Sequence, residues 1–287
     1  EPALLLRNCA PLLAFLPLFG ACHQDDAPVP VAHPHYELGN AWQGPQGWFY
    51  PYEQFDYRAT GLATRETPLK GHLASDGEVW SADGMTGSHQ TLQLPAVVTV
   101  RNLINGRVVR IRLTRRGPES AGRIIALSPK AADLLGMTAD TPVEVTEDEA
   151  ASRALVEGLT GAPHLDVQSA PVGEVRAESL DGGTAKTYGS DSSEGHQAAS
   201  TVAAMPVTWS QSNPGPTGLY VLLGKFSGRG AAASIAARCS GEVQRVPDGG
   251  GLDWRVRSGP YTDTAQADAA LDRTHACGVE GARIIVE

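Results

Sequence analysis

VVTVRNLINGRVVRIRL, at residues 97–113, is the stretch that decides the fold of the first half of the chain. Apolar and polar residues alternate on both sides of Asn105-Gly106, which is typical of two strands that each bury one face. Asn-Gly favours a tight hairpin because both residues tolerate positive φ angles. The sequence therefore predicts an antiparallel hairpin with its junction at Ile104-Asn105-Gly106. Its buried positions are Val98, Val100, Val109, Ile111 and Leu113.

The segment that follows, GRIIALSPKAADLLGM at residues 122–137, predicts a short strand and then a helix. Ser128 before Pro129 suits an N-cap followed by the first helical position. Gly136 suits the C-cap, because glycine readily adopts a positive φ. Together these elements predict a small β-barrel that carries one short helix.

Composition limits the class of protein. The chain has 287 residues, 32 Gly, 20 Pro and a net charge of −9, which fits one or two domains joined by unfolded chain. The longest apolar run, Ala10 to Leu18, is too short to cross a bilayer, and no fixed repeat is found, so polytopic membrane and fibrous classes are excluded. Residues 57–139 hold eleven Lys or Arg against six Asp or Glu, which indicates a basic domain suited to an acidic ligand.

Residues 1–22 are predicted to be a signal peptide. One Arg, an apolar stretch and small residues precede Cys22, and Leu18 to Cys22 resembles a bacterial lipobox, in which the cysteine carries lipid. The alternative is an ordinary secretory signal that is cleaved nearby. In both cases the chain is exported, and residues 23–56 form a tether and N-terminal extension.

Two cysteines, Cys239 and Cys277, remain in the folded part of the chain. In an oxidising compartment they can form a disulfide, and the alternative is a pair of buried free thiols. There is no CxxC pair, and His33 and His35 lie in a Pro-rich tether, so neither a metal site nor a cofactor is expected.

Residues 141–215 are predicted to be a disordered acidic linker. They run through EDEAAS and GGTAKTYGSDSSEGHQAAS into SQSNPGPTG, and contain almost no aromatic residues. Such a segment buries too little apolar surface to offset the entropy lost on ordering. The two folded domains are then residues 57–140 and residues 216–287.

The run from Thr60 to Met137 resembles the double-psi β-barrel domain of the rare lipoprotein A family of bacterial lytic transglycosylases. The matching stretches are YELGNAWQGPQGWFY at 36–50, TGLAT at 60–64, SDGE at 75–78, SHQTLQLP at 88–95, VRNLINGR at 100–107 and RRGPESAGRIIALSPKAADLLGM at 115–137. The resemblance implies a six-stranded barrel that cleaves the bond between N-acetylmuramic acid and N-acetylglucosamine, with the muramoyl 6-hydroxyl as nucleophile. Glu78 then matches the family's acid/base, and His89 keeps its family position near it.

The family's second carboxylate aligns with Arg115 in this sequence. A negative charge is thereby replaced by a positive one, and an Arg115 that reached Glu78 would lower the pKa of that acid. The remaining acids that offer a negative charge are Asp76, Asp83 and Glu119. Arg115 and Arg116 belong to an Arg-rich stretch that either binds the lactyl carboxylates of a glycan or forms a solvated barrel face.

Residues 218–287 predict the order strand, helix, strand, strand, helix, strand. With GKF at 224–226 and GPY at 259–261, this segment resembles the sporulation-related repeat (SPOR) domain, which binds glycans stripped of stem peptides. The resemblance implies a small α+β domain with glycan on its open sheet face, and two helices close enough for a bridge between Cys239 and Cys277. The residues on the matching strands are Tyr220, Trp254, Arg255 and Arg257. Strand alternation places the two arginines on one face and Trp254 on the other.

Two functions from different classes remain. The first is a lipid-anchored, endolytic peptidoglycan transglycosylase that acts on peptide-free glycan strands at the septum. The second is a non-catalytic peptidoglycan-binding lipoprotein, with Arg115 as the discriminating residue. Both place the protein in the envelope of a Gram-negative bacterium, at the periplasmic side of the outer membrane. Glycan strands and divisome proteins are its expected partners, and nucleic acid is excluded because the chain is exported and acidic.

Overall fold

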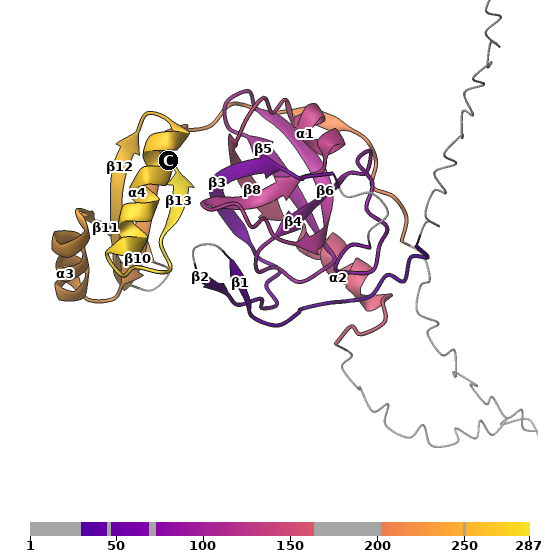
Figure 1. Cartoon of the computed structure of the whole chain (residues 1–287), viewed down its shortest axis with the longest axis horizontal. Coiled ribbons are helices and arrows are strands. Elements are labelled where there is room, and N and C mark those ends of the chain that lie inside the picture. The colour runs from indigo at the N-terminus through magenta and orange to yellow at the C-terminus, as the bar shows by residue number, and fades with distance from the viewer. Residues whose placement is uncertain (1–29, 45–46, 69–72, 164–201, 249–250) are drawn as a thin grey trace, which may run out of the picture.

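The computed structural model describes residues 30–44, 47–68, 73–163, 202–248 and 251–287. Figure 1 shows a β-barrel and, beside it, a smaller C-terminal domain of strands and helices. The predicted signal peptide, its Cys22 and the middle of the predicted linker lie outside the described residues. None of the described helices is long and apolar enough to span a bilayer.

Six strands close the barrel: β3 (Arg58–Arg65), β4 (Thr86–His89), β5 (Ala96–Asn102), β6 (Arg107–Arg116), β7 (Arg123–Leu127) and β8 (Thr141–Glu147). They are hydrogen-bonded in the order β4-β7-β3-β8-β5-β6, and a further pairing of β4 with β6 closes the ring. The β3–β7 and β4–β6 pairs are parallel, and the other pairs of the ring are antiparallel. The predicted six-stranded barrel is confirmed.

The hairpin of β5 and β6 forms where the sequence predicts it. Val98 pairs with Ile111 and Val100 with Val109, and all four side chains are buried. Gly106 at the junction has a φ of +75°, which favours glycine.

Helix α1 (Pro129–Leu135) begins and ends at its predicted caps. The Ser128 hydroxyl accepts a hydrogen bond from the Ala131 N–H, and Gly136 ends the helix in the left-handed conformation. The helix packs on the barrel core through Ala131, Ala132 and Leu135.

Strand β8 contradicts the predicted start of the linker at residue 141. It lies between β3 and β5, so the barrel would be open without it. Its buried positions alternate regularly and are Thr141, Val143, Val145 and Glu147. Only two of these residues are apolar, which is why the polar, acidic sequence conceals the strand. The barrel domain continues into α2 (Glu149–Glu157), where the Ser152 hydroxyl accepts from the backbone N–H of Val97.

The end of the predicted linker also packs on the barrel. Strand β9 (Trp209–Gln211) pairs with β6, and the Ala203 carbonyl accepts from Arg112 Nη1 at 2.8 Å. The Gly215 N–H donates to the Leu103 carbonyl at 2.8 Å. Residues 141–163 and 202–215 are therefore ordered chain, in contrast to the prediction.

Residues 30–44 and 47–56 lie along the barrel in place of a free tether. Strands β1 (Trp42–Gly44) and β2 (Gly47–Phe49) form a short hairpin in which Trp42 stacks on Phe49, with ring centroids 4.7 Å apart. The backbone N–H groups of His33 and His35 donate to the carbonyls of Gly77 and Asp76. This extension consequently covers the turn that carries Glu78.

The C-terminal domain has the predicted order of strands and helices. Its elements are β10 (Leu219–Phe226), α3 (Arg229–Cys239), β11 (Glu242–Asp248), β12 (Gly251–Tyr261), α4 (Thr264–Ala276) and β13 (Arg283–Val286). The antiparallel sheet has the order β11-β12-β10-β13. Small residues Ala232, Ala236, Ala267 and Ala270 let the two helices pack against this sheet.

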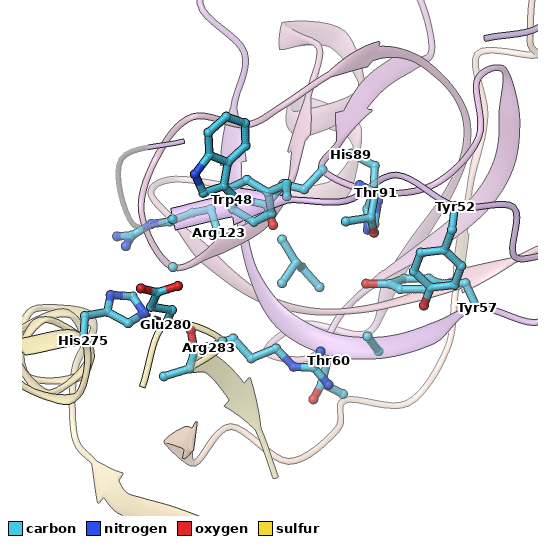
Figure 2. Close-up of a pocket in the computed structure, with 18 residues that line it drawn as sticks. Trp48, Tyr52, Tyr57, Thr60, His89, Thr91, Arg123, His275, Glu280 and Arg283 are labelled. Atoms are coloured by element: carbon cyan, nitrogen blue, oxygen red, sulfur yellow. Dashed lines mark hydrogen bonds between the residues drawn. The ribbon is translucent and has the colours of Figure 1, made fainter. Parts of the chain in front are cut away.

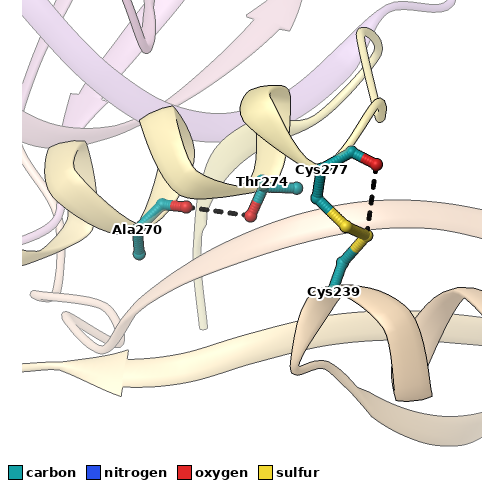
Figure 3. Close-up of a disulfide and its surroundings, with 4 residues drawn as sticks. All are labelled: Cys239, Ala270, Thr274 and Cys277. Atoms are coloured by element: carbon teal, nitrogen blue, oxygen red, sulfur yellow. Dashed lines mark hydrogen bonds between the residues drawn. A yellow bond between two sulfur atoms is a disulfide. The ribbon is translucent and has the colours of Figure 1, made fainter.

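A disulfide joins the ends of the two helices (Figure 3). Cys239 is the last residue of α3 and Cys277 follows α4, and their Cα atoms are 5.8 Å apart. Within α4, the Thr274 hydroxyl donates to the Ala270 carbonyl at 2.8 Å.

The C-terminal domain contacts the barrel through β13 and α4. The Thr60 hydroxyl donates to the Val286 carbonyl at 2.8 Å and accepts from the Val286 N–H at 3.1 Å. Arg123 of β7 is held by Asp140 of the barrel domain and by Asp268 of α4. The side chain of Leu62 from β3 packs with the core of the C-terminal domain.

Candidate active site

Glu78 lies at the end of a tight turn that crosses the barrel surface. The Ala74 N–H donates to the Glu78 carbonyl at 2.7 Å, and the Asp76 N–H donates to the Thr114 carbonyl of β6 at 3.1 Å. Gly77 has a φ of +80°, and a Cβ there would lie 2.1 Å from the His33 carbonyl oxygen. Glycine is therefore required between Asp76 and Glu78.

Glu78, Arg112 and Asp76 form a buried charge cluster. Glu78 Oε2 accepts from Arg112 Nη2 at 2.5 Å, and the two side chains are 15% and 5% exposed. Asp76 is fully buried, and its Oδ1 accepts from the Glu78 N–H at 3.1 Å. Burial, followed by the neighbouring charge of Glu78, raises the pKa of Asp76 to about 8. At neutral pH, Asp76 therefore carries a proton next to Glu78.

This cluster has the properties of a proton-transfer site. Among the residues that the structure describes, Glu78 Oε1 and Asp76 Oδ2 are buried without a hydrogen-bond partner, a costly arrangement that is typical of functional positions. A carboxyl group that titrates close to neutral pH can both give and take back a proton during one reaction. Arg112 places a positive charge against the Glu78 carboxylate.

Arg115 forms no ion pair with Glu78 in the described part of the chain; its Nη1 atom lies 3.7 Å from Glu66 Oε2. Arg112 occupies the place beside Glu78 that the sequence suggested for Arg115. Sequence reasoning missed both partners, because Arg112 lies on the outward face of β6, where only the folded chain at Glu78 and Ala203 covers it, and Glu66 belongs to no motif. The only local signal for Arg112 is its place in the Arg-rich stretch.

The three acids that could replace the family's second carboxylate, Asp76, Asp83 and Glu119, have different surroundings. Asp76 is the one beside Glu78. Glu119 lines a cavity together with Arg115, and Asp83 follows Ser81, whose hydroxyl accepts from the Asp83 N–H.

The contacts that His89 makes within the described chain are with residues other than Glu78. Its Nδ1 accepts from the N–H groups of Thr91 and Leu92 at 3.2 and 3.1 Å, and its ring meets Tyr57 edge-on at 4.8 Å. Burial lowers the pKa of His89 to about 3, so the ring is neutral. These contacts give His89 a structural role in the loop after β4.

Arg116 also has structural contacts in place of the predicted glycan contact. Its Nη1 donates to the carbonyls of His89 and Leu92, and its Nη2 donates to the carbonyl of Leu38. The guanidinium thus fastens the N-terminal extension to the barrel.

In the C-terminal domain, Arg255 and Arg257 share a face with Tyr220. The Arg257 guanidinium lies 3.8 Å from the centroid of the Tyr220 ring, and both arginines pair with the carboxylate of Glu287. Trp254 packs with the helix-covered core, where Arg229 of α3 lies 5.6 Å from its ring. Trp254 therefore lies on the helix-covered face of the sheet, opposite to Arg255 and Arg257, as strand alternation predicts.

A cavity of about 290 Å³ lies between the barrel and the C-terminal domain (Figure 2). On the barrel side, Tyr52 and Tyr57 lie together and Trp48 lies apart from them, and His275, Glu280 and Arg283 come from the C-terminal domain. Its lining does not include Glu78, so this cavity is separate from the charge cluster. Among the residues that the structure describes, no three metal-binding side chains of His, Cys, Asp or Glu lie together.

Two family models match the chain. The model described as "Lytic transglycolase" matches residues 60–146, and the SPOR domain model matches residues 215–281. The first match extends into β8, in agreement with the place of that strand in the barrel.

The chain is similar to an endolytic peptidoglycan transglycosylase RlpA from Neisseria meningitidis, with 31% identity over 182 residues that cover 61% of this chain and 68% of the relative. The chain belongs to the RlpA family. The RlpA of Pseudomonas aeruginosa strain UCBPP-PA14 is 29% identical over 284 residues, which cover 87% of this chain and 81% of that protein. The crystal structure of an RlpA SPOR domain from Pseudomonas aeruginosa matches 24% of this chain and 100% of that chain, with 21% identity and a TM-score of 0.23. The predicted resemblance to the RlpA family is confirmed.

Proposed function

We propose that this protein is an endolytic peptidoglycan transglycosylase of the bacterial cell envelope that acts on peptide-free glycan strands. The observation that carries the proposal is the buried cluster of Glu78, Asp76 and Arg112 on a barrel that matches the lytic transglycolase model. Relatives of similar domain content are named as endolytic peptidoglycan transglycosylases, which supports the same activity here.

In the proposed reaction, Glu78 is the acid/base. Its protonated form gives a proton to the glycosidic oxygen as the bond from that oxygen to muramoyl C1 breaks. The muramoyl 6-hydroxyl oxygen bonds to C1, and its proton passes to the Glu78 carboxylate, so no water is consumed. Asp76 holds a proton next to Glu78, and passing it to Glu78 once generates the acid form; the 6-hydroxyl proton then regenerates that form at the end of each turnover. Arg112 stabilises the carboxylate form.

The C-terminal domain is proposed to hold the glycan through Tyr220, Arg255 and Arg257. Aromatic rings stack on sugar faces, and the planar guanidinium group matches a carboxylate. Glu287 occupies both guanidinium groups in the structure, and the lactyl carboxylate of muramic acid would take its place. The proposal also includes a lipid anchor at Cys22 in the outer membrane. It further includes recruitment of the protein to the septum and contact with divisome proteins.

A non-catalytic glycan-binding lipoprotein is the second candidate, and the positive charge of Arg115 favours it. The two are separated by incubating purified peptide-free glycan strands with the chain from Asp25 onward and identifying the products by mass spectrometry. Anhydro-muramoyl products from the unmodified protein support the transglycosylase. Their absence, together with product from an Arg115→Asp variant, would support the binding protein.

Glu78→Gln is expected to lower the rate of product formation at least about 100-fold, because an amide cannot exchange the proton. Asp83→Asn is the matched control, since it makes the same chemical change on an acid outside the cluster. Equal activity of Glu78→Gln and the unmodified protein would rule out the catalytic assignment.

A further inference from the structure

A cavity of about 300 Å³ opens where β3, β4, β6 and β7 come together. This volume is at the lower end of the range of small-ligand sites. Glu66, which follows β3, and Arg115 of β6 lie next to each other in its lining. The other polar side chains of the lining are Thr64, Arg65, Thr67, Ser88, Arg116, Glu119 and Ser120.

Glu66 is a carboxylate buried at an energetic cost. Its side chain is 2% exposed, and Oε2 accepts from the Trp80 indole N–H at 2.7 Å. Burial raises the pKa of Glu66, and the Trp80 hydrogen bond, the charge of Arg115 and a hydrogen bond from Ser88 act in the opposite direction. A neutral glutamine would accept the same bond from Trp80 without this cost. The bond to Trp80 therefore does not explain why the residue is acidic.

Arg115 gives a reason for that charge. Its Nη1 lies 3.7 Å from Glu66 Oε2, which is near enough for strong attraction but too far for a hydrogen bond. The Arg115 side chain is 24% exposed, whereas Nη1 itself is buried beside Glu66 with no hydrogen-bond partner among the described residues. Glu66 thus orients the guanidinium through Nη1, and the exposed side of the group leaves its other donors open to a ligand. The neighbouring Arg116 differs, because carbonyl groups occupy its donors.

The available donors of Arg115 suit one particular group of a peptide-free glycan. A guanidinium group binds a carboxylate through two parallel N–H donors. In such a glycan, the lactyl group of muramic acid is the carboxylate. We propose that Glu66 is a positioning residue that holds Arg115 as an oriented donor for the lactyl carboxylate of a muramic acid residue in this cavity. The choice of glycan rests on the proposed function.

The Trp80 indole provides a local signal for the test, because its N–H donates to Glu66. In a ¹H–¹⁵N spectrum of the chain from Asp25 onward, the five tryptophans give five indole signals, and Trp80→Phe identifies the relevant one. N-acetylmuramic acid is expected to shift the Trp80 signal, and N-acetylglucosamine, which lacks the lactyl group, is expected to leave it in place. Equal shifts with both sugars, or no shift with either, would overturn the proposal.

Glu66→Gln removes the charge and keeps an acceptor for Trp80. The dissociation constant for N-acetylmuramic acid is expected to rise at least about fivefold, as it does in Arg115→Gln, because the contact acts through Arg115. The double variant is expected to bind no more weakly than Arg115→Gln alone. A lower unfolding temperature with an unchanged dissociation constant would indicate a purely structural role and overturn the proposal. If Glu66→Gln does not fold, Glu66→Asp withdraws the carboxylate by one methylene and must weaken binding as well.

This test is independent of catalysis, because the monosaccharide contains no bond to cleave. A protein that binds as expected and leaves glycan strands uncut would contradict the proposed function alone. A protein that cuts strands, but whose Trp80 indole signal does not shift with N-acetylmuramic acid, would contradict this inference alone.

Discussion

Asp76 and Glu78 lie two residues apart on one turn, but their carboxyl groups have different surroundings. Glu78 faces the guanidinium of Arg112, whereas Asp76 is enclosed and has one oxygen without a partner. The N-terminal extension contributes to this enclosure, because His35 donates to the Asp76 carbonyl. A protonated carboxyl thereby lies beside an ion-paired one, which allows a proton to be passed on and returned.

Asp76→Asn tests this difference through stability. The pKa of Asp76 in the folded protein, about 8, lies above its ordinary value of 3.8, so the folded state keeps a proton that the unfolded chain releases. The stabilisation of the folded state by this proton is complete below about pH 4 and is lost as the pH rises through about 8. Asparagine cannot ionise, so the variant does not lose this stabilisation. As the pH rises, its free energy of unfolding should increase relative to that of the unmodified protein by up to about 1 kcal/mol per pH unit.

Urea unfolding of both proteins between about pH 5 and pH 8 measures this change. The difference between them isolates Asp76, because Glu147, whose pKa burial raises to about 7, titrates in both. A difference that stays constant over this range would contradict the protonated state of Asp76.

At the scale of elements, β8 determines whether the barrel is complete. It pairs with β3 on one side and β5 on the other, and Val143 and Val145 fill the core from it. The segment from residue 141 onward is therefore part of the folding unit, and a barrel that ends at residue 140 would expose the edges of both neighbouring strands.

Val143→Ala is expected to lower the free energy of unfolding by about 2 kcal/mol, because it removes two buried methyl groups and leaves a cavity. Val207→Ala is the matched control, since Val207 is 52% exposed and should change stability by less than about 0.5 kcal/mol. Denaturant unfolding of the two variants makes the comparison. Similar values for both would mean that β8 contributes little to the core.

The sequence predicted those elements whose signals are local. The Asn105-Gly106 turn and the caps Ser128 and Gly136 are defined by residues next to one another. Strand β8 was not predicted, because two of its four buried positions are polar and the alternation of apolar and polar residues is therefore weak. The two ion-pair partners Arg112 and Glu66 were not predicted for another reason. Arg112 contacts Glu78, and Glu66 contacts Arg115, only in the closed barrel.

At the scale of the whole molecule, side chains of both domains hold the barrel and the C-terminal domain together. Arg123 bridges Asp140 and Asp268, and Thr60 bonds to the backbone of Val286. The cavity of Figure 2 owes its shape to this contact, because its walls come from both domains.

Asp268→Asn removes the α4 side of the Arg123 bridge. A partly buried ion pair contributes about 1 kcal/mol, so the undocked fraction should rise roughly fivefold, while the Thr60 contact limits the effect. Nuclear spin relaxation of the C-terminal domain should then report faster tumbling. Asp133→Asn is the control, since its partner Arg65 lies within the barrel domain. The same tumbling in both variants would contradict a role for Asp268 in docking.

The return of the chain to the barrel after residue 201 changes what the stretch from 164 to 201 can do. Before it, Thr160 pairs with His35 on the barrel, and after it, Ala203 bonds to Arg112 and β9 extends β6. Both ends of this stretch are therefore fixed to the same scaffold. Insertions within residues 164–201 would therefore leave the C-terminal domain in the same place on the barrel. Evolution can lengthen this stretch without moving Arg255 and Arg257 away from Glu78.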